Sequence, residues 1–282
     1  MTTKRFVRSG RAELCVEDSA TSGTPVVCLH AGVCDRRMWA PQVEAMQTAH
    51  RMVAYDRRGF GETRCEKEPF SHVSDLIAVL DALQIERAVL LGCSQGGRIA
   101  IDTALAHPSR VAALVLVAAA ISGAPDEEDE THSPLLRSRF DAYDAAEQRG
   151  DRDALNELEA QVWLDGPEQP TGRVTGALRE LFLGMNAIAL AAPSPGAAIE
   201  PTSAWERIEQ IGAPTLIACG RFDFASLVER MHALARRIPA AELFMIEGSA
   251  HLPSLEQPDL FNARVARFLE SLQRRARYSR PE

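Results

Sequence analysis

The sequence predicts an α/β fold in which helices flank a mostly parallel central sheet, with a helical insertion. Short, nearly continuous apolar runs alternate with stretches whose apolar residues recur at helical spacing. This alternation is typical of βαβ units, and strands that are apolar throughout are typical of parallel sheets covered on both faces. Between residues 122 and 200 no strand-like run occurs, and segments rich in acidic residues or in Pro and Gly bound the stretch. We therefore expect a helical insertion on a sheet domain.

The composition is that of a globular protein. The chain has 282 residues, 46% of them hydrophobic, which excludes a disordered or fibrous chain. The net charge of −8 argues against a nucleic-acid partner, which would usually require a basic face. No apolar run reaches the roughly 18 residues that span a bilayer, and no apolar signal segment follows the N-terminus. Six cysteines are scattered without zinc-ligand spacing, so no metal site is predicted. We expect a cytoplasmic protein with no membrane partner.

Six apolar runs predict the strands of the sheet. They span residues 25–29, 51–55, 88–91, 113–117, 214–218 and 242–246. Helical periodicity predicts helices at 71–83, 96–106 and 258–275, and within the insertion at 135–163 and 173–185. This pattern divides the chain into a first core part (1–121), a helical cap (122–200) and a second core part (201–282).

The strand at 88–91 leads directly into a G-x-S-x-G motif that a helix follows, Gly92-Cys93-Ser94-Gln95-Gly96. A very tight turn between a strand and a helix strains its central residue, and the residues two positions away on each side must be small. Gly92 and Gly96 meet this need. The turn would expose the Ser94 hydroxyl beside the N-terminal amides of the helix, which attract developing negative charge. The alternative is an ordinary serine that caps a helix.

A serine hydroxyl needs a base, and the base needs a group to orient it. His251 follows the last predicted strand in the segment Gly-Ser-Ala-His-Leu-Pro, and Asp223 follows the strand before it. Both residues therefore fall at carboxyl ends of strands, where Ser94 also emerges, in the chain order serine, acid, histidine. Asp126 follows an earlier strand and is a second candidate for the acid, although it lies inside an acidic run.

Two further segments complete a resemblance to a known family. One is His30-Ala31-Gly32 after the first buried strand, with Trp39 a short distance on, and the other is the loop YDRRGFGET at 55–63. With the serine turn and the Asp and His loops, these segments resemble the α/β-hydrolase superfamily over nearly the whole chain. The resemblance is closest to the branch of small esterases, enol-lactonases, cofactor-free haloperoxidases and carbon–carbon bond hydrolases. His-Ala stands where members of the family usually carry His-Gly.

The resemblance implies an α/β-hydrolase fold and a role for each residue of the site. Ser94 would be the nucleophile, His251 the general base, and Asp223 the carboxylate that orients the histidine. The backbone N–H groups of Gly32 and Gln95 would form the oxyanion hole. No metal and no organic cofactor is implied.

Three polar residues near these loops are interpreted as structural. His30 is expected to tie down its own loop through hydrogen bonds. Asp56 and Arg57 are expected to fix the turn that follows them.

The cap is expected to cover the site and to supply apolar side chains to a substrate pocket. The candidate lining residues are Trp39, Phe140, Trp163, Phe182 and Met185. Packing in the core is the alternative for each of them, since apolar residues at helical spacing serve either purpose.

The expected function is hydrolysis of a carboxylic ester or lactone through an acyl-enzyme, with that small molecule as the partner. The same triad serves carbon–carbon bond hydrolases and haloperoxidase-like perhydrolases, so these reactions stay open. A ligand receptor on the same fold, with little or no turnover, is the alternative from a different class. The assembly state, including a homodimer, also stays open.

Overall fold

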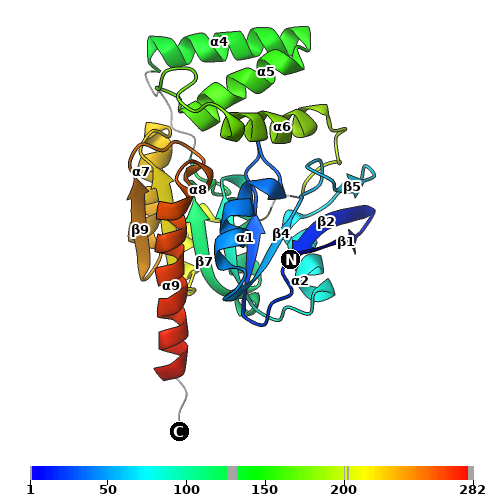
Figure 1. Cartoon of the computed structure of the whole chain (residues 1–282), viewed down its shortest axis with the longest axis vertical. Helices are drawn as coiled ribbons and strands as arrows, with labels where there is room; N and C mark the ends of the chain where they lie inside the picture. Colours follow the sequence, from blue (N-terminus) through cyan, green and yellow to red (C-terminus); the bar gives the residue numbers. More distant parts are fainter. Residues whose placement is uncertain (1, 126–131, 200, 202, 279–282) are drawn as a thin grey trace.

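The computed structural model describes residues 2–125, 132–199, 201 and 203–278. In this part of the chain nine strands form a single sheet (Figure 1). The strands are β1 (Thr3–Ser9), β2 (Ala12–Asp18), β3 (Thr24–Leu29), β4 (His50–Tyr55), β5 (Arg64–Cys65), β6 (Ala88–Cys93), β7 (Val111–Val117), β8 (Thr215–Gly220) and β9 (Ala241–Ile246). Their order in the sheet is β1-β2-β4-β3-β6-β7-β8-β9, with β5 beside β2.

The six predicted strands correspond to β3, β4 and β6 to β9, and all pairs among these six are parallel. The mostly parallel sheet is therefore confirmed. The strands β1, β2 and the short β5, which pair antiparallel along one edge of the sheet, were not predicted from the sequence. Most side chains of β1 are exposed, so this edge strand lacks the apolar run that revealed the others.

Helices cover both faces of the sheet and extend beyond its edge. They are α1 (Ala40–Met46), α2 (His72–Ala82), α3 (Gln95–Ala106), α4 (Pro134–Arg149), α5 (Arg152–Glu159), α6 (Ala177–Ala191), α7 (Ala225–Arg237), α8 (Pro253–Glu256) and α9 (Pro258–Tyr278). Shorter turns are η1 (Arg36–Trp39), η2 (Pro108–Arg110) and η4 (Trp205–Gln210), of 3-10 type, and the π-helical turn η3 (Ala160–Asp165). None of the described helices is long and apolar enough to span a bilayer.

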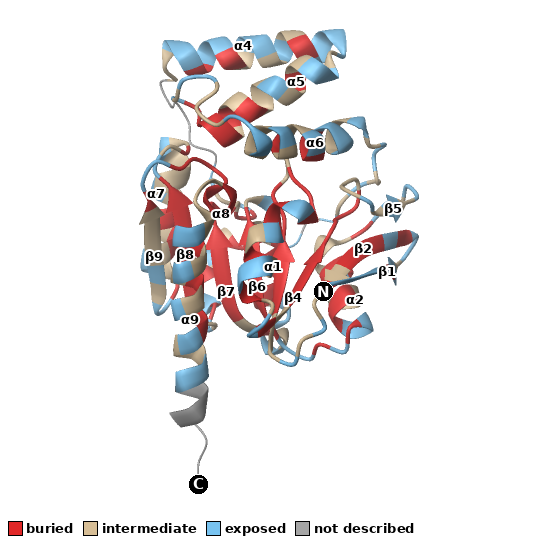
Figure 2. Cartoon of the chain, in the orientation of Figure 1, coloured by how far each residue is buried: buried red, intermediate tan, exposed pale blue. Residues whose placement is uncertain are grey.

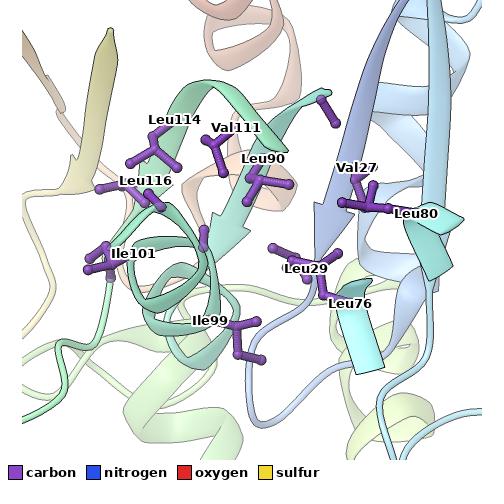
Figure 3. Packing of buried hydrophobic residues seen from close by; sticks show 14 of the residues in the cluster. Val27, Leu29, Leu76, Leu80, Leu90, Ile99, Ile101, Val111, Leu114 and Leu116 are labelled. Atoms are coloured by element: carbon purple, nitrogen blue, oxygen red, sulfur yellow. The ribbon is translucent and has the colours of Figure 1, made fainter. Parts of the chain in front are cut away.

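The core consists of two apolar layers, one on each face of the sheet. Val27 and Leu29 of β3 belong to the layer that includes apolar residues of α2, α3 and α7, and Figure 3 shows them near Leu76, Leu80 and Ile99. The alternate residues of β3 point to the other face, where α1, α8 and α9 cover them. The interior strands are buried on both faces for this reason (Figure 2), which explains their continuous apolar sequences.

The described residues between β7 and β8 form helices and loops only, and α4, α5, η3 and α6 lie above one end of the sheet (Figure 1). We call these four segments the cap. The helix predicted at 135–163 is interrupted, because Gly150 adopts φ 65° and ends α4, and Asp151 then caps α5. The helix predicted at 173–185 begins later, at Ala177, after Gly176 at φ 65°.

Candidate active site

Ser94 lies on the tight turn between β6 and α3, with φ 53° and ψ −116°. A non-glycine residue rarely adopts a positive φ, and such strain costs about 1–3 kcal/mol. The Ser94 N–H donates to the carbonyl of Val117 at 2.9 Å, at the end of β7. Its carbonyl accepts from the N–H groups of Ala120 and Arg98 at 3.0 Å each. The neighbouring strand and the following helix therefore hold the strained serine in place.

The glycines of the motif are required by close approach of the backbone. A Cβ atom at Gly92 would overlap the backbone of Gly96, and a Cβ atom at Gly96 would overlap the carbonyl oxygens of Leu29 and His30. Side chains at either position would push α3 away from β6 and β3. The two small residues thus let the helix start directly behind the serine.

The predicted acid and base meet in the structure. Asp223 follows β8, His251 follows β9, and the His251 Nδ1–H donates to Asp223 Oδ2 at 2.7 Å. Both side chains are buried, and Asp223 Oδ1 accepts the N–H of Phe224 at 2.9 Å. An ionised carboxylate only accepts, so Nδ1 carries a proton and Nε2 is the ring nitrogen left for other contacts. Asp126, the second candidate for the acid, lies outside the described residues.

The loops that carry these residues contact each other and the serine turn. The N–H of Phe222 donates to the carbonyl of Ser249 at 2.8 Å, which joins the Asp loop to the His loop. The Cys93 thiol, directly before the serine, lies 3.7 Å from the carbonyl of His251. The three loops, which follow the parallel strands β6, β8 and β9, therefore converge at the carboxyl edge of the sheet.

A carboxylate that was not predicted from sequence supports the His loop. Buried Glu256 accepts the N–H groups of Ala250 at 2.9 Å and Leu252 at 3.3 Å, on either side of the histidine. Arg173, from the loop between η3 and α6, pairs with Glu256 and donates to the carbonyl of Gly248 at 2.9 Å. Burial raises the pKa of Glu256, and the Arg173 charge opposes that shift. Arg173 and Glu256 are 83 positions apart and belong to no motif, so no sequence signal joined them.

The two residues predicted for the oxyanion hole lie side by side. A Cβ atom at Gly32 would approach the side-chain amide of Gln95 to 3.0 Å, so Gly32 packs directly against that side chain. Gln95 is the first residue of α3, directly after Ser94. The Gln95 side chain is exposed, and Ser94 is half-buried. The serine turn and the loop after β3 thus form adjacent walls of one site.

Two of the residues interpreted as structural hold their loops as expected. His30 Nε2 accepts the N–H of Arg57 at 3.0 Å, and its Nδ1–H donates to the carbonyl of Ala31 at 2.8 Å. Burial and the Arg57 charge hold the pKa of His30 well below its usual range, so the ring is neutral. Asp56 accepts the N–H of Glu62 at 2.8 Å, which fixes the turn between residues 56 and 62, and it also accepts the N–H of Arg36 at 2.8 Å.

Arg57 meets this expectation only in part. Its guanidinium lies over the Phe60 ring of that turn, at 4.4 Å, but it donates outside the turn, to Gln95 Oε1 at 2.9 Å and to the carbonyl of Ala31 at 3.1 Å. Both acceptors belong to the loops of the predicted oxyanion hole.

A cavity of about 250 Å³ lies among α4, α5 and η3 of the cap, with Phe224 of the core on one side. Its lining residues are Arg139, Phe140, Tyr143, Leu158, Glu159, Val162, Trp163 and Phe224. The Trp163 ring packs against the ring of His251, with centroids 4.6 Å apart, and against Phe224 at 5.4 Å. Phe140 and Trp163 of the predicted pocket therefore lie at this cavity.

The other three predicted pocket residues lie elsewhere. Trp39, Phe182 and Met185 are fully buried in the core layer that includes α1 and α9, and none of them lines this cavity. Helical spacing alone could not separate these core residues from lining residues. Among the residues that the structure describes, no three His, Cys, Asp or Glu side chains are grouped to hold a metal ion.

Comparisons with known proteins agree with this fold. The family profile described as alpha/beta hydrolase fold matches residues 24–258. A candidate 2-succinyl-6-hydroxy-2,4-cyclohexadiene-1-carboxylate synthase of Bacillus subtilis (strain 168) is 28% identical, over 91% of this chain and 94% of that protein. The 3-oxoadipate enol-lactonase 1 of Acinetobacter baylyi is 25% identical, over 85% and 86% of the two chains. A thermophilic esterase from Thermogutta terrifontis has a similar structure, with a TM-score of 0.76, 27% identity and coverage of 96% and 99%. The chain therefore belongs to the α/β-hydrolase family.

Proposed function

We propose that this protein is a serine hydrolase that cleaves a carboxylic ester or lactone through an acyl-enzyme. The observation that carries the proposal is the buried 2.7 Å hydrogen bond between His251 and Asp223 in a loop packed against the serine turn. A hydroxyl becomes an effective nucleophile only beside a base that a third group orients. A ligand receptor would have no need of this arrangement.

In the proposed reaction, the Ser94 hydroxyl attacks the substrate carbonyl while His251 Nε2 takes its proton. Asp223 keeps Nδ1 protonated and stabilises the imidazolium that forms. The N–H groups of Gly32 and Gln95 bind the oxyanion of the tetrahedral intermediate. His251 returns the proton to the leaving alcohol, which leaves an ester between Ser94 and the acyl group. Water then attacks this ester by the same steps and releases the acid.

The cavity supports an apolar substrate group. Most of its lining is aromatic or aliphatic, and Trp163 connects it to the ring of His251. Apolar pockets favour hydrophobic groups of matching size. The relatives described as an esterase and an enol-lactonase support an oxygen ester as the substrate.

The proposal is tested with an organophosphonate probe and a series of p-nitrophenyl esters of increasing acyl length. Wild-type protein should be labelled stoichiometrically and should hydrolyse at least the esters that fit the cavity. Ser94→Ala should lose the labelling and about 10⁶-fold in kcat, the cost of removing a triad serine. Absence of both labelling and turnover in the wild type would contradict the proposal and favour the receptor.

A further inference from the structure

Arg57 is a buried cation whose partners are all neutral. Its side chain is 2% exposed, and the ring of Phe60 covers the guanidinium at 4.4 Å. The acceptors of its side chain are Gln95 Oε1 and the carbonyl of Ala31, and Nε has no acceptor among the described residues. No carboxylate of the described residues forms an ion pair with it. Burial lowers the pKa of Arg57 to about 10, so it remains charged at neutral pH.

Two neighbouring arginines have carboxylate partners instead. Arg58, the next residue, is equally buried but binds both oxygens of Asp75, at 2.9 and 3.0 Å, and Glu68 at 2.6 Å. Arg36 binds Asp56 at 2.5 Å. An uncompensated buried charge is costly, whereas paired charges recover much of that cost. Carboxylates thus accompany these two arginines, while Arg57 has no carboxylate partner among the described residues and keeps its charge next to the serine turn.

The guanidinium connects the two walls of the predicted oxyanion hole. On one side it holds the side chain of Gln95, whose backbone N–H is one predicted donor. On the other side it binds the carbonyl of the peptide that joins Ala31 to Gly32, whose N–H is the second donor. His30 Nδ1–H donates to the same carbonyl at 2.8 Å. Two donors on one carbonyl fix the plane of that peptide, since its C=O and N–H point in opposite directions.

Hydrogen bonding also strengthens the donor. A charged group that binds a peptide carbonyl polarises the peptide, and the N–H on its other side becomes a better donor. The Arg57 charge also acts on a neighbouring ring: burial and this charge hold the pKa of the half-buried His72 at about 3. A fixed positive charge in a site of low dielectric stabilises negative charge that develops nearby.

We infer that Arg57 is a positioning residue of the oxyanion hole, which fixes the Ala31–Gly32 peptide and Gln95 and stabilises the anionic tetrahedral intermediate. This inference rests on the proposed hydrolase function. It assigns Arg57 an effect on the transition state, and little effect on substrate binding. A purely structural arginine would affect folding stability alone.

The test compares Arg57→Met with the wild type in ester hydrolysis and in inhibition by a boronic acid. A boronic acid adds to the serine oxygen and forms a tetrahedral anion that resembles the transition state. Arg57→Met should lower kcat by roughly 100-fold, the range for loss of one oxyanion donor, and should weaken the boronate by a similar factor. The KM should stay within about threefold, because uniform binding is unaffected. Arg57→Lys, which keeps the charge, should recover part of both losses.

Two controls keep the outcomes distinct. Arg110→Met removes an arginine that binds carbonyls and Asp81 beside the amino end of β7, and kcat should not change. A wild type without labelling or turnover would mean that the hydrolase proposal itself had failed. With an active wild type, a folded Arg57→Met variant whose kcat is within about threefold of normal would overturn the inference, as would a kcat loss without a weaker boronate.

Gln95→Met provides a second test if Arg57→Met does not fold. This variant keeps the backbone N–H of residue 95 and removes the acceptor of Arg57. It should lower kcat and boronate affinity together, by roughly 10-fold, because one of the two walls is released. Unchanged kcat and boronate affinity would overturn the inference.

Discussion

The two sides of the serine turn each bury a charged side chain, but the partners of that side chain differ. On the side of β8 and β9, the Asp223 carboxylate contacts the imidazole of His251, and Glu256 of α8 pairs with Arg173. On the side of β3 and β4, the Arg57 guanidinium has only neutral acceptors.

The difference follows the charge that each side meets in the proposed reaction. The imidazole becomes positive when it takes the serine proton, and a carboxylate stabilises it. The carbonyl oxygen becomes negative, and the guanidinium lies behind the groups that would bind it. A counter-ion for Arg57 would cancel this field. Two buried charges of opposite sign therefore flank the serine, each on the side where the opposite charge develops.

Asp223→Asn, on the side of the acid and the base, should cause the largest loss of kcat among the variants of the two sides. An asparagine keeps the shape but favours the wrong tautomer of His251, and kcat should fall by about 10⁴-fold. The loss should be smaller with Arg57→Met, which leaves the base intact. Asp126→Asn serves as the control, and kcat should be nearly unchanged. The reverse result for these two variants, measured with the p-nitrophenyl esters, would assign the acid to Asp126.

Arg173→Met tests, through folding stability, whether the buried charge of Glu256 needs its charged partner. It leaves the Glu256 carboxylate buried without its partner, which should lower the free energy of unfolding by about 3 kcal/mol at pH 8. Without Arg173 the pKa of Glu256 rises further. The carboxyl then binds a proton more readily in the folded state, so the penalty is small at low pH and grows as pH rises through that pKa.

Urea unfolding of wild type and Arg173→Met at pH 5 and pH 8 measures this pH dependence. Arg149→Met, which removes an exposed cap arginine paired with Asp151 at 3.8 Å, should have little effect at either pH. If Arg173→Met lowers the free energy of unfolding equally at pH 5 and pH 8, the protonation of Glu256 does not depend on Arg173.

Glu62→Gln should have the smallest effect on stability and none on kcat. It tests whether charges on the β4 side affect kcat only when they lie near the serine. Glu62 is 48% exposed, and its bonds with Lys4 and Arg36 lower its pKa to about 2. Its stabilisation is therefore present above its ordinary pKa of 4.5 and is lost as pH falls toward 2. Because solvent screens the group, the substitution should cost less than about 1 kcal/mol at pH 7. A change in kcat would mean that charges remote from the serine also tune the site.

Much of the site was predictable because its signals are local. The serine turn needs glycines at fixed offsets, and the acid and the base follow apolar strands, so a short window of sequence identifies each of them. Asp223 and His251 then meet because consecutive parallel strands end at one edge of the sheet. The cap resisted the same method: Phe140 and Phe182 are both apolar residues of helices, yet one lines the cavity and the other lies in the core.

The amino-acid sequence by itself determined the six apolar strands, the strained serine turn and the order of the three loops, because each depends on side chains a few positions apart. Tertiary structure alone decided which polar groups meet. Arg57 and Arg58 are adjacent and chemically identical, but one binds Gln95 while the other binds Asp75. Successive side chains leave the backbone in different directions, so what each one reaches depends on how distant segments pack around it.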